Sequence, residues 1–320
     1  MSEDVRWGVL GAGWLVEHAT AAAIHKAEGA KLYATGARSL DRARATEPEV
    51  AYPSYQQVID DDRVEAIYIC LANDAHLEWI EAAIRGGKHV LCEKPLVLTC
   101  SEAIAVFALA EQHGVHLVEA TWTRWHPRMR RIVGLARAGD LGELIEYRAS
   151  FTFEGIPEGN YRLFPQHGGG ALYDVGIYPL HGLVACLPQV ENFDLVTIRS
   201  ELGGHGVDMT TEASLAWSDQ SRAHITCSFA RPPEQEFTLI GRDGRVHVPD
   251  NEAFASWRTG TTLLVNGFVE EFEPVDAYQV MFHEMSRRIR GEEGWLLPAF
   301  DSIRVARTVD LMRGASVGQG

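Results

Sequence analysis

The chain has 320 residues, 46% of them hydrophobic, and a formal net charge of −15. This length and apolar content can bury a large core and indicate two domains, and the negative charge disfavours nucleic acid or an anionic membrane surface as a partner. No apolar run is long enough to span a bilayer, and the acidic N-terminus does not resemble a secretory signal. The five cysteines have no paired spacing. We therefore expect a soluble cytoplasmic protein with reduced thiols.

The first 120 residues alternate short apolar strands with helix-like stretches, which is the pattern of βαβ units around a parallel sheet. The predicted strands are residues 6–10, 31–36, 64–71, 89–92 and 115–119, and the predicted helices are 16–26, 40–44 and 76–85. Ser39 is expected to cap the second of these helices.

From about residue 143 the pattern changes to strands joined by hairpin-like turns, which indicates a mostly antiparallel sheet. The predicted strands are 144–153, 193–202, 207–218, 222–229, 237–240 and 262–272, and the predicted helices are 169–187, 275–290 and 301–314. Asp301 is expected in a capping position. We expect an α/β protein with a doubly wound parallel sheet over 1–122 and an α+β domain over 123–320.

A glycine-rich turn follows the first predicted strand, in the run Gly11-Ala12-Gly13-Trp14-Leu15-Val16. It fits the first two glycines of a dinucleotide fingerprint, whereas Val16 departs from the small residue at the third position. Gly11 would allow the tight turn, and Gly13 would let the backbone approach a pyrophosphate at the next helix's N-terminus.

The end of the second strand indicates which cofactor is bound. NAD-specific sites usually place a carboxylate there, whereas this chain has Arg38 followed by Ser39. A guanidinium can clamp a 2′-phosphate, and the serine can add a hydrogen bond. Arg42 either adds positive charge to the phosphate site or is solvated. Asp41, in the first turn of the next helix, is expected to interact favourably with the helix dipole. NADP is favoured, with NAD as the alternative.

Two further strands of the predicted sheet end in polar residues. Glu93-Lys94-Pro95 follows the apolar run 89–92, so Lys94 would point into the crevice where open α/β sheets bind ligands. Asn73 and His76 follow the strand 64–71 and could contact the nicotinamide ribose. Alternatively, Asn73 or its neighbour caps the next helix.

A second glycine run opens the segment from Gly168 to Tyr178. Three glycines allow the backbone to approach a ligand or another domain closely. Asp174 and Tyr178 are four residues apart and would share one helical face. Taken alone, the segment could equally be a helix packed on the sheet.

Together these motifs resemble the glucose–fructose oxidoreductase, inositol dehydrogenase and rhizopine-catabolism family (Gfo/Idh/MocA). The matching segments, in the family's order, are Trp7-Gly8-Val9-Leu10-Gly11-Ala12-Gly13, Glu93-Lys94-Pro95, Glu119-Ala120, Arg124-Trp125-His126-Pro127 and residues 168–179. The resemblance implies a Rossmann domain, a second domain with a large open sheet and a substrate between the two. It also implies a homodimer or homotetramer.

The resemblance assigns a catalytic lysine to Lys94, an acid to Asp174 and the proton-transfer residue to Tyr178. Many members have histidine at the last position, so the chain is more similar to aldose (xylose-type) and dimeric dihydrodiol dehydrogenases. The predicted cofactor contacts are Gly11, Gly13, Trp14, Leu15, Arg38, Ser39, Asn73, His76, Glu93 and Lys94.

Hydride transfer to or from a carbinol carbon requires a group that moves the hydroxyl proton. A free tyrosine, with a pKa of about 10, is a poor base at neutral pH. An ammonium about 4 Å away contributes roughly 4 kcal/mol, or about three pKa units, and burial opposes that shift. Lys94 could therefore bring the pKa of Tyr178 towards the working range, and Asp174 could orient Lys94 or bind a substrate hydroxyl.

The remaining candidates are weaker. Arg162 could bind a sugar hydroxyl, and Trp14, Trp122 or Trp125 could stack on a sugar ring, although buried packing is the expected role of the tryptophans. His113 and His116 have a metal-like spacing without a third ligand, so no metal site is predicted.

The predicted function is NADP-preferring hydride transfer on a secondary alcohol, ketone or anomeric carbon of a sugar or related polyol. Trans-dihydrodiol dehydrogenase is the first alternative. Two others are an enzyme that retains its NAD(H) during glycoside cleavage and a non-catalytic NADP-binding sensor.

Overall fold

The computed structural model describes residues 4–187, 194–249, 251–254 and 258–317. The chain divides into two compact units. Unit 1 contains the described residues up to Trp122 together with Asp276–Ser302, and unit 2 contains Thr123–Val275 and the described residues from Ile303 onward. Residues 276–302 were predicted to belong to the second domain, so that part of the predicted division is wrong.

Residues 276–302 belong to unit 1 because helix α8 (Ala277–Ile289) packs into the core of that unit. Helix α8 packs its Phe282 ring edge-on against Trp7 and Tyr68, with centroids 5.1 and 5.2 Å apart. The Trp7 indole donates a hydrogen bond to Ser286 Oγ at 3.0 Å. The burial of these large rings couples α8 to the core of unit 1.

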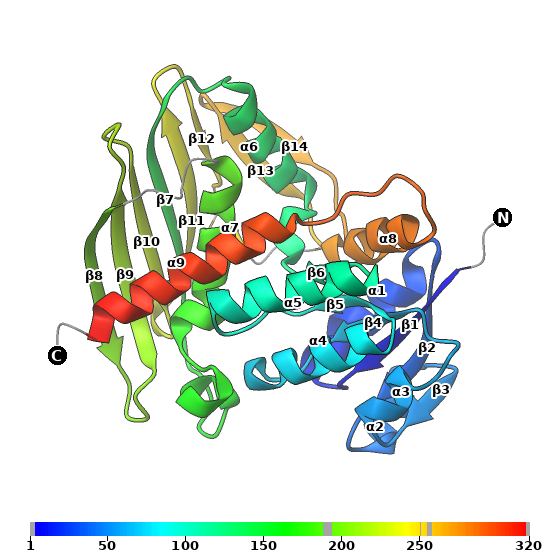
Figure 1. The fold of residues 1–320 in the computed structure, drawn as a ribbon. Helices are drawn as coiled ribbons and strands as arrows, with labels where there is room; N and C mark the ends of the chain where they lie inside the picture. The colour runs from blue at the N-terminus through cyan, green and yellow to red at the C-terminus, as the bar shows by residue number, and fades with distance from the viewer. Residues whose placement is uncertain (1–3, 188–193, 250, 255–257, 318–320) are drawn as a thin grey trace. The chain divides into compact units, whose positions relative to one another are not determined.

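Unit 1 is built on a six-stranded parallel sheet with the order β3-β2-β1-β4-β5-β6 (Figure 1). The strands are β1(Val5–Leu10), β2(Ala30–Gly36), β3(Val50–Tyr52), β4(Ala66–Ile69), β5(His89–Cys92) and β6(Leu117–Glu119). The order reverses between β1 and β4, and ligands bind at the carboxyl ends of strands beside such a switch point. The prediction of a doubly wound parallel sheet is confirmed.

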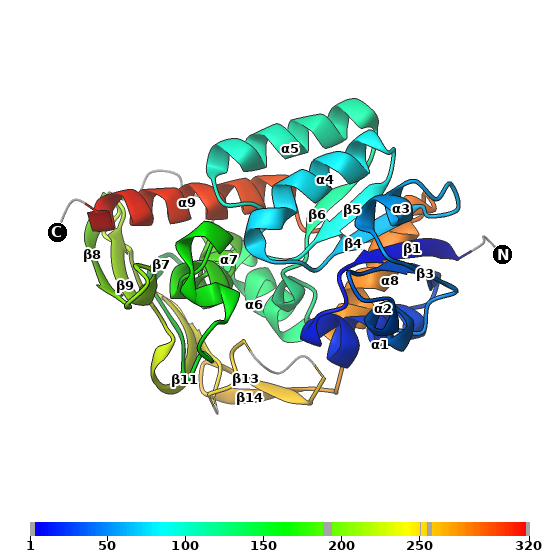
Figure 2. The same ribbon diagram turned by 90° about the horizontal axis from the view of Figure 1, so that it is seen from below.

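Helices cover both faces of this sheet. They are α1(Ala21–Lys26), α2(Leu40–Ala45), α3(Tyr55–Ile59), α4(His76–Arg85), α5(Cys100–His113) and α8. Helices α4 and α5 lie along one face, and α1 lies against α8 on the opposite face (Figure 2). The predicted cap is confirmed, since Ser39 Oγ accepts a hydrogen bond from the Arg42 amide. Strand β3 and helices α3 and α5 were not predicted from the sequence.

Unit 2 contains an eight-stranded sheet with the order β14-β13-β12-β11-β7-β10-β9-β8. The strands are β7(Leu144–Glu154), β8(Asp194–Leu202), β9(Asp208–Ala216), β10(Arg222–Ser228), β11(Ala230–Gly241), β12(Arg245–His247), β13(Thr261–Val265) and β14(Phe268–Phe272). Neighbouring strands are antiparallel except for the parallel pair β7 and β10. The predicted, mostly antiparallel sheet is therefore confirmed.

The helices of unit 2 are α6(Pro127–Ala138), α7(Ile177–Cys186) and the greater part of α9(Ala299–Val317). In both views they lie on the same side of the large sheet (Figures 1 and 2). No helix in the described part of the chain is both long and apolar enough to cross a membrane.

Two predictions in unit 2 need correction. The predicted strand 262–272 is a hairpin, because Asn266 and Gly267 both have positive φ (53° and 87°) and form a turn typical of two-residue hairpins. Asp301 does not cap α9, which begins at Ala299 and places Asp301 in its first turn.

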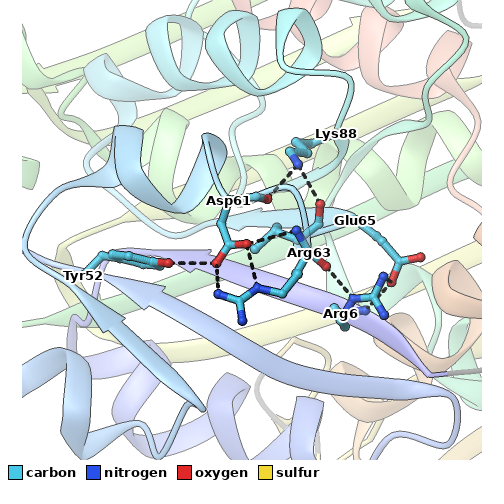
Figure 3. Close-up of polar contacts among 7 residues, drawn as sticks. Arg6, Tyr52, Asp61, Arg63, Glu65 and Lys88 are labelled. Atoms are coloured by element: carbon cyan, nitrogen blue, oxygen red, sulfur yellow. Dashed lines mark hydrogen bonds and ion pairs between the residues drawn. The ribbon is translucent and has the colours of Figure 1, made fainter.

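A polar network lies around Asp61, in the loop before β4 (Figure 3). Its carboxylate accepts hydrogen bonds from Tyr52 and from Arg63. Burial alone would raise the pKa of Asp61, but these bonds lower it to about 2. The Lys88 ammonium, on a side chain that is largely buried, donates to the carbonyls of Asp61 and Val64 at 2.9 and 2.8 Å.

We expect Lys88→Met to destabilise the protein by about 2 kcal/mol, because it leaves two carbonyl groups without their charged donor. Urea unfolding measures this loss. Lys31→Met is the matched control, since Lys31 is exposed and pairs with Glu49 at the surface. Equal destabilisation by the two substitutions would contradict a structural role for the Lys88 ammonium.

Candidate active site

The glycine turn after β1 has the geometry that the sequence predicts. Gly11 has φ of +105°, and a Cβ there would lie 2.4 Å from the carbonyl oxygen of Cys70 at the end of β4. A Cβ on Gly13 would meet nothing within 4 Å. Gly11 is therefore required by the fold itself, whereas Gly13 leaves its backbone open to a bound group.

The helix after this turn begins with a π-helical stretch, Val16–Thr20, in which the Ala21 amide bonds to the Val16 carbonyl. Val16, the departure from the fingerprint, is fully buried. Leu15 is partly buried, whereas Trp14 is 62% exposed and stacks on His18, with ring centroids 4.7 Å apart. The expectation that Trp14 is buried is wrong, and its indole faces solvent at the turn.

The end of β2 presents two arginines, Arg38 and Arg42, whose side chains are exposed. No acidic side chain in the described residues pairs with either of them. Asp41 is directed to Arg44 instead, at 3.4 Å, and the hydroxyl of Ser39 already caps α2. The two guanidinium groups therefore have the charge and the freedom to bind a phosphate.

The residues after β5 surround a buried acid. Glu93 accepts a hydrogen bond of 2.6 Å from the Tyr68 hydroxyl and one of 3.3 Å from the Lys94 amide. Burial raises the pKa of Glu93 to about 7, although these bonds and the charge of Lys94 oppose the shift. The Lys94–Pro95 peptide is cis. Lys94 is half-buried and follows the strand end, where it was predicted.

His76 is fully buried, and its ring nitrogens lie 2.8 Å from the Pro95 carbonyl and 3.3 Å from the Leu71 carbonyl. This arrangement does not support the predicted contact with a nicotinamide ribose. His76 instead links the loop after β4 to the loop after β5 through these two carbonyl groups. Asn73 is also buried and begins the short 3₁₀ turn that precedes α4.

In unit 2 the second glycine run packs against its own chain. The Gly170 amide donates to the Arg162 carbonyl, and the Gly169 amide donates to the Phe164 carbonyl. A Cβ on Gly169 would lie 2.5 Å from the Arg162 carbonyl oxygen. The close approach that was predicted for a ligand or another domain is thus made to the segment around Arg162.

This packing brings Arg162 to Asp174. The Arg162 Nε lies 2.9 Å from Asp174 Oδ2, and the guanidinium also covers the Tyr161 ring at 4.7 Å. Burial would lower the pKa of Arg162, but the charge of Asp174 and, to a smaller extent, the phenol of Tyr178 raise it. Arg162, Asp174 and Tyr178 therefore form one electrostatic group, in which the positive and negative charges balance.

Asp174 lies in the π-helical turn Leu172–Gly176, and Tyr178 lies at the start of α7. The Tyr178 ring is 9% exposed and contacts Phe151 and Phe254, with centroids 5.6 and 6.1 Å apart. The Tyr178 ring is thus packed against two aromatic rings, and its phenol lies within the electrostatic influence of Arg162. Trp125 is only 1% exposed, which favours packing over the predicted stacking on a sugar, and Trp122 is likewise buried.

Asp208 is a residue that the sequence analysis missed. Its carboxylate accepts hydrogen bonds from the Leu172 amide at 2.8 Å and from Thr211 at 2.9 Å, and so fixes the start of the turn that carries Asp174. Burial raises its pKa, and these bonds oppose the rise. Phe151 and Phe254 were missed as well, since strand and loop aromatics carry no motif.

An open glycine turn beside two exposed arginines, at the carboxyl edge of a doubly wound sheet, defines a dinucleotide-binding protein. Residues 5–121 match the family model described as "Oxidoreductase family, NAD-binding Rossmann fold", and residues 129–247 match "GFO/IDH/MocA C-terminal domain". The chain belongs to the Gfo/Idh/MocA oxidoreductase family, as predicted.

Relatives in this family are enzymes. The chain is 31% identical over 315 residues to D-xylose 1-dehydrogenase (NADP(+)) 2 of Haloferax volcanii, covering 95% of each. It is 30% identical over 283 residues to trans-1,2-dihydrobenzene-1,2-diol dehydrogenase of Danio rerio, covering 86% of this chain and 81% of that one. A 3-ketoreductase of Actinomadura kijaniata, solved with NADP and TDP-benzene, superposes with a TM-score of 0.88 at 27% identity over 98% of both chains.

Proposed function

We propose that this protein is an NADP-preferring oxidoreductase that acts on a secondary alcohol, ketone or anomeric carbon of a sugar or related polyol. The observation that carries the proposal is the grouping of Tyr178, Asp174 and Arg162 in unit 2. It combines a phenol that can move a proton with a charge-balanced pair that can bind hydroxyl groups. The NADP preference is supported by Arg38 and Arg42 and by the relatives named for or solved with NADP.

In the proposed reaction, bound NADP supplies the hydride chemistry at the substrate carbon. Tyr178 takes the hydroxyl proton in the oxidative direction and returns it in the reductive direction. The family resemblance assigns Lys94 as the electrostatic partner of Tyr178, and the Asp174–Arg162 pair would hold a neighbouring hydroxyl. Gly11 and Gly13 would hold the pyrophosphate, and Arg38 and Arg42 the 2′-phosphate.

The relatives support the assignment of Lys94 and Tyr178. Solved structures of the Actinomadura kijaniata reductase include variants in which a lysine is replaced by alanine and a tyrosine by phenylalanine. The two replaced residues are separated by the same number of positions as Lys94 and Tyr178 here. A non-catalytic sensor gains no support from relatives of this kind.

A trans-dihydrodiol dehydrogenase is the second candidate. The partly exposed Phe151 ring lies beside Tyr178 and stacks on the buried Phe254, and an aromatic diol would pack on the Phe151 ring. The relative from Danio rerio carries that name.

The test is a titration with NADPH and NADH, followed by a screen of aldoses, keto-sugars and aromatic trans-diols by nicotinamide absorbance. Turnover with NADPH on one class would support the proposal and separate the two candidates. Tight NADPH binding without any turnover would overturn the enzymatic proposal. Copurified cofactor that does not exchange would point to retained NAD(H), and failure to bind either cofactor would refute the nucleotide site.

The location and assembly of the protein stay predictions. We propose a cytoplasmic homodimer or homotetramer on the family resemblance. Light scattering on the purified protein measures its mass, and a monomer across the working concentration range would contradict the oligomer.

We expect Lys94→Ala to raise the kinetic pKa of kcat/KM by at least about one unit, because the ammonium no longer favours the ionised phenol. The proton-accepting form of Tyr178 would then be populated only at higher pH. Lys94→Arg keeps the positive charge and should restore most of the original profile. A pH profile that does not move in Lys94→Ala would contradict the proposed role.

A further inference from the structure

An aromatic pair that no motif predicted lies at the same edge of unit 1 as the two arginines. Tyr55 is the first residue of α3, directly after its cap Ser54, and its ring meets Trp79 of α4. The ring centroids are 5.1 Å apart and the planes are nearly perpendicular, at 83°. Trp79 thus restricts the orientation of the Tyr55 ring from one side.

The backbone explains why Tyr55 lies near Arg38. Gly36 pairs with Tyr52 in the ladder between β2 and β3, and the Ala37 amide donates to the Tyr52 carbonyl at 3.1 Å. A Cβ on Gly36 would lie 3.0 Å from the Ser54 carbonyl oxygen. The segments that lead into Arg38 and Tyr55 are therefore bonded to each other where their strands end.

The hydroxyl of Tyr55 differs from those of Tyr52, Tyr68 and Tyr147, which all have acceptors. The Tyr33 hydroxyl, in β2, also lacks a partner among the described residues, but it is buried. Tyr52 donates to Asp61, Tyr68 to Glu93 and Tyr147 to the Pro179 carbonyl. Tyr55 has no hydrogen-bond partner among the residues that the structure describes. A half-buried phenol normally finds an acceptor, so this one is left for solvent or a ligand.

The charges of Arg38 and Arg42 act on the Tyr55 phenol, which agrees with a position of Tyr55 near both arginines. Burial raises the pKa of Tyr55, and the positive charges of Arg38 and Arg42 act on the phenol in the opposite direction. The pKa stays above its ordinary value, so the phenol is a neutral donor at working pH. All three side chains can donate hydrogen bonds to an anion, and none of the three is an acceptor with negative charge.

We propose that Tyr55 is a specificity-determining residue of the cofactor site. Its hydroxyl donates a hydrogen bond to the 2′-phosphate that Arg38 and Arg42 hold, and Trp79 fixes the ring that carries this hydroxyl. The proposal rests on the NADP preference given above. It predicts that Tyr55 contributes to NADPH binding but not to NADH binding, because only NADPH carries the 2′-phosphate.

The test is the dissociation constant of each reduced cofactor, measured by fluorescence titration. We expect Tyr55→Phe to weaken NADPH binding about tenfold, the size of one hydrogen bond to a charged group, and to leave NADH binding within about twofold. Trp79→Leu should weaken NADPH binding by a smaller factor. Tyr52→Phe is the matched control, since its phenol at the neighbouring strand end is bonded to Asp61, and it should not change the ratio.

The outcomes separate this inference from the proposed function. An unchanged NADPH-to-NADH ratio in Tyr55→Phe, with a wild type that prefers NADPH, overturns the role of Tyr55 and leaves the function standing. An equal loss for both cofactors also overturns it, because Tyr55 would then contact a part that they share. A wild type that prefers NADH overturns the cofactor preference itself.

Discussion

Tyr178→Phe should lower kcat by at least about 100-fold, because a positioned general acid/base contributes 10²–10⁴-fold and phenylalanine cannot move a proton. The ring would keep its contacts with Phe151 and Phe254, so folding should be unaffected. NADPH affinity should stay within about twofold, because the phenol contributes proton transfer and not cofactor binding. Steady-state kinetics and cofactor titration on the same preparation measure both quantities.

Tyr173→Phe is the control for this substitution. Tyr173 lies in the same π-helical turn as Asp174, and its ring lies under the Arg313 guanidinium at 4.5 Å. Loss of the Tyr173 hydroxyl should therefore leave kcat nearly unchanged. Near-normal turnover in Tyr178→Phe would remove Tyr178 from the mechanism, and a comparable loss in Tyr173→Phe would show that the effect is not specific.

Gly170→Ala should destabilise the protein by about 3 kcal/mol or more, since it combines backbone strain with a steric clash. Gly170 has φ of +119°, and a Cβ there would lie 2.1 Å from Asp208 Oδ1. Asp208 would have to leave the Leu172 amide, which fixes the turn that carries Asp174. We expect a lower melting temperature together with reduced turnover.

Gly155→Ala separates the two causes. Gly155 also has positive φ, +94°, but a Cβ there would meet nothing within 4 Å. Gly155→Ala should lose only the stability that the strained backbone costs, because no clash is added, and its turnover should be unchanged. Equal stability losses in the two variants would mean that the contact between Gly170 and Asp208 does not matter.

Most of the parallel sheet could be predicted, because its strands are short, buried apolar runs separated by helices. Helix α5 was missed although Thr99 and Glu102 form a complete capping box at its start. Helix α6 also carried a local signal, a proline at its first position. Both helices are therefore marked in the sequence at their first residues.

The strand-end residues of the candidate site could be predicted because topology alone places them. Arg38 and Lys94 each follow a strand whose carboxyl end lies at the binding edge. The Arg162–Asp174 pair and the contact of Asp208 with the Leu172 amide could not be predicted. Each joins two segments that are separate in the sequence and come together only when the loops pack. The glycines near residue 169 were correctly recognised as sites of close approach, but their partner was a loop of the same unit.

The return of residues 276–302 to unit 1 has a consequence for the order of events during synthesis. Domains usually fold as their residues leave the ribosome, the N-terminal one first. Here the Trp7 indole has no acceptor, and the Trp7 and Tyr68 rings lack Phe282, until α8 has emerged. All strands of unit 2 precede α8 in the chain. The nascent nucleotide-binding unit therefore stays incomplete until every strand of unit 2 has been made.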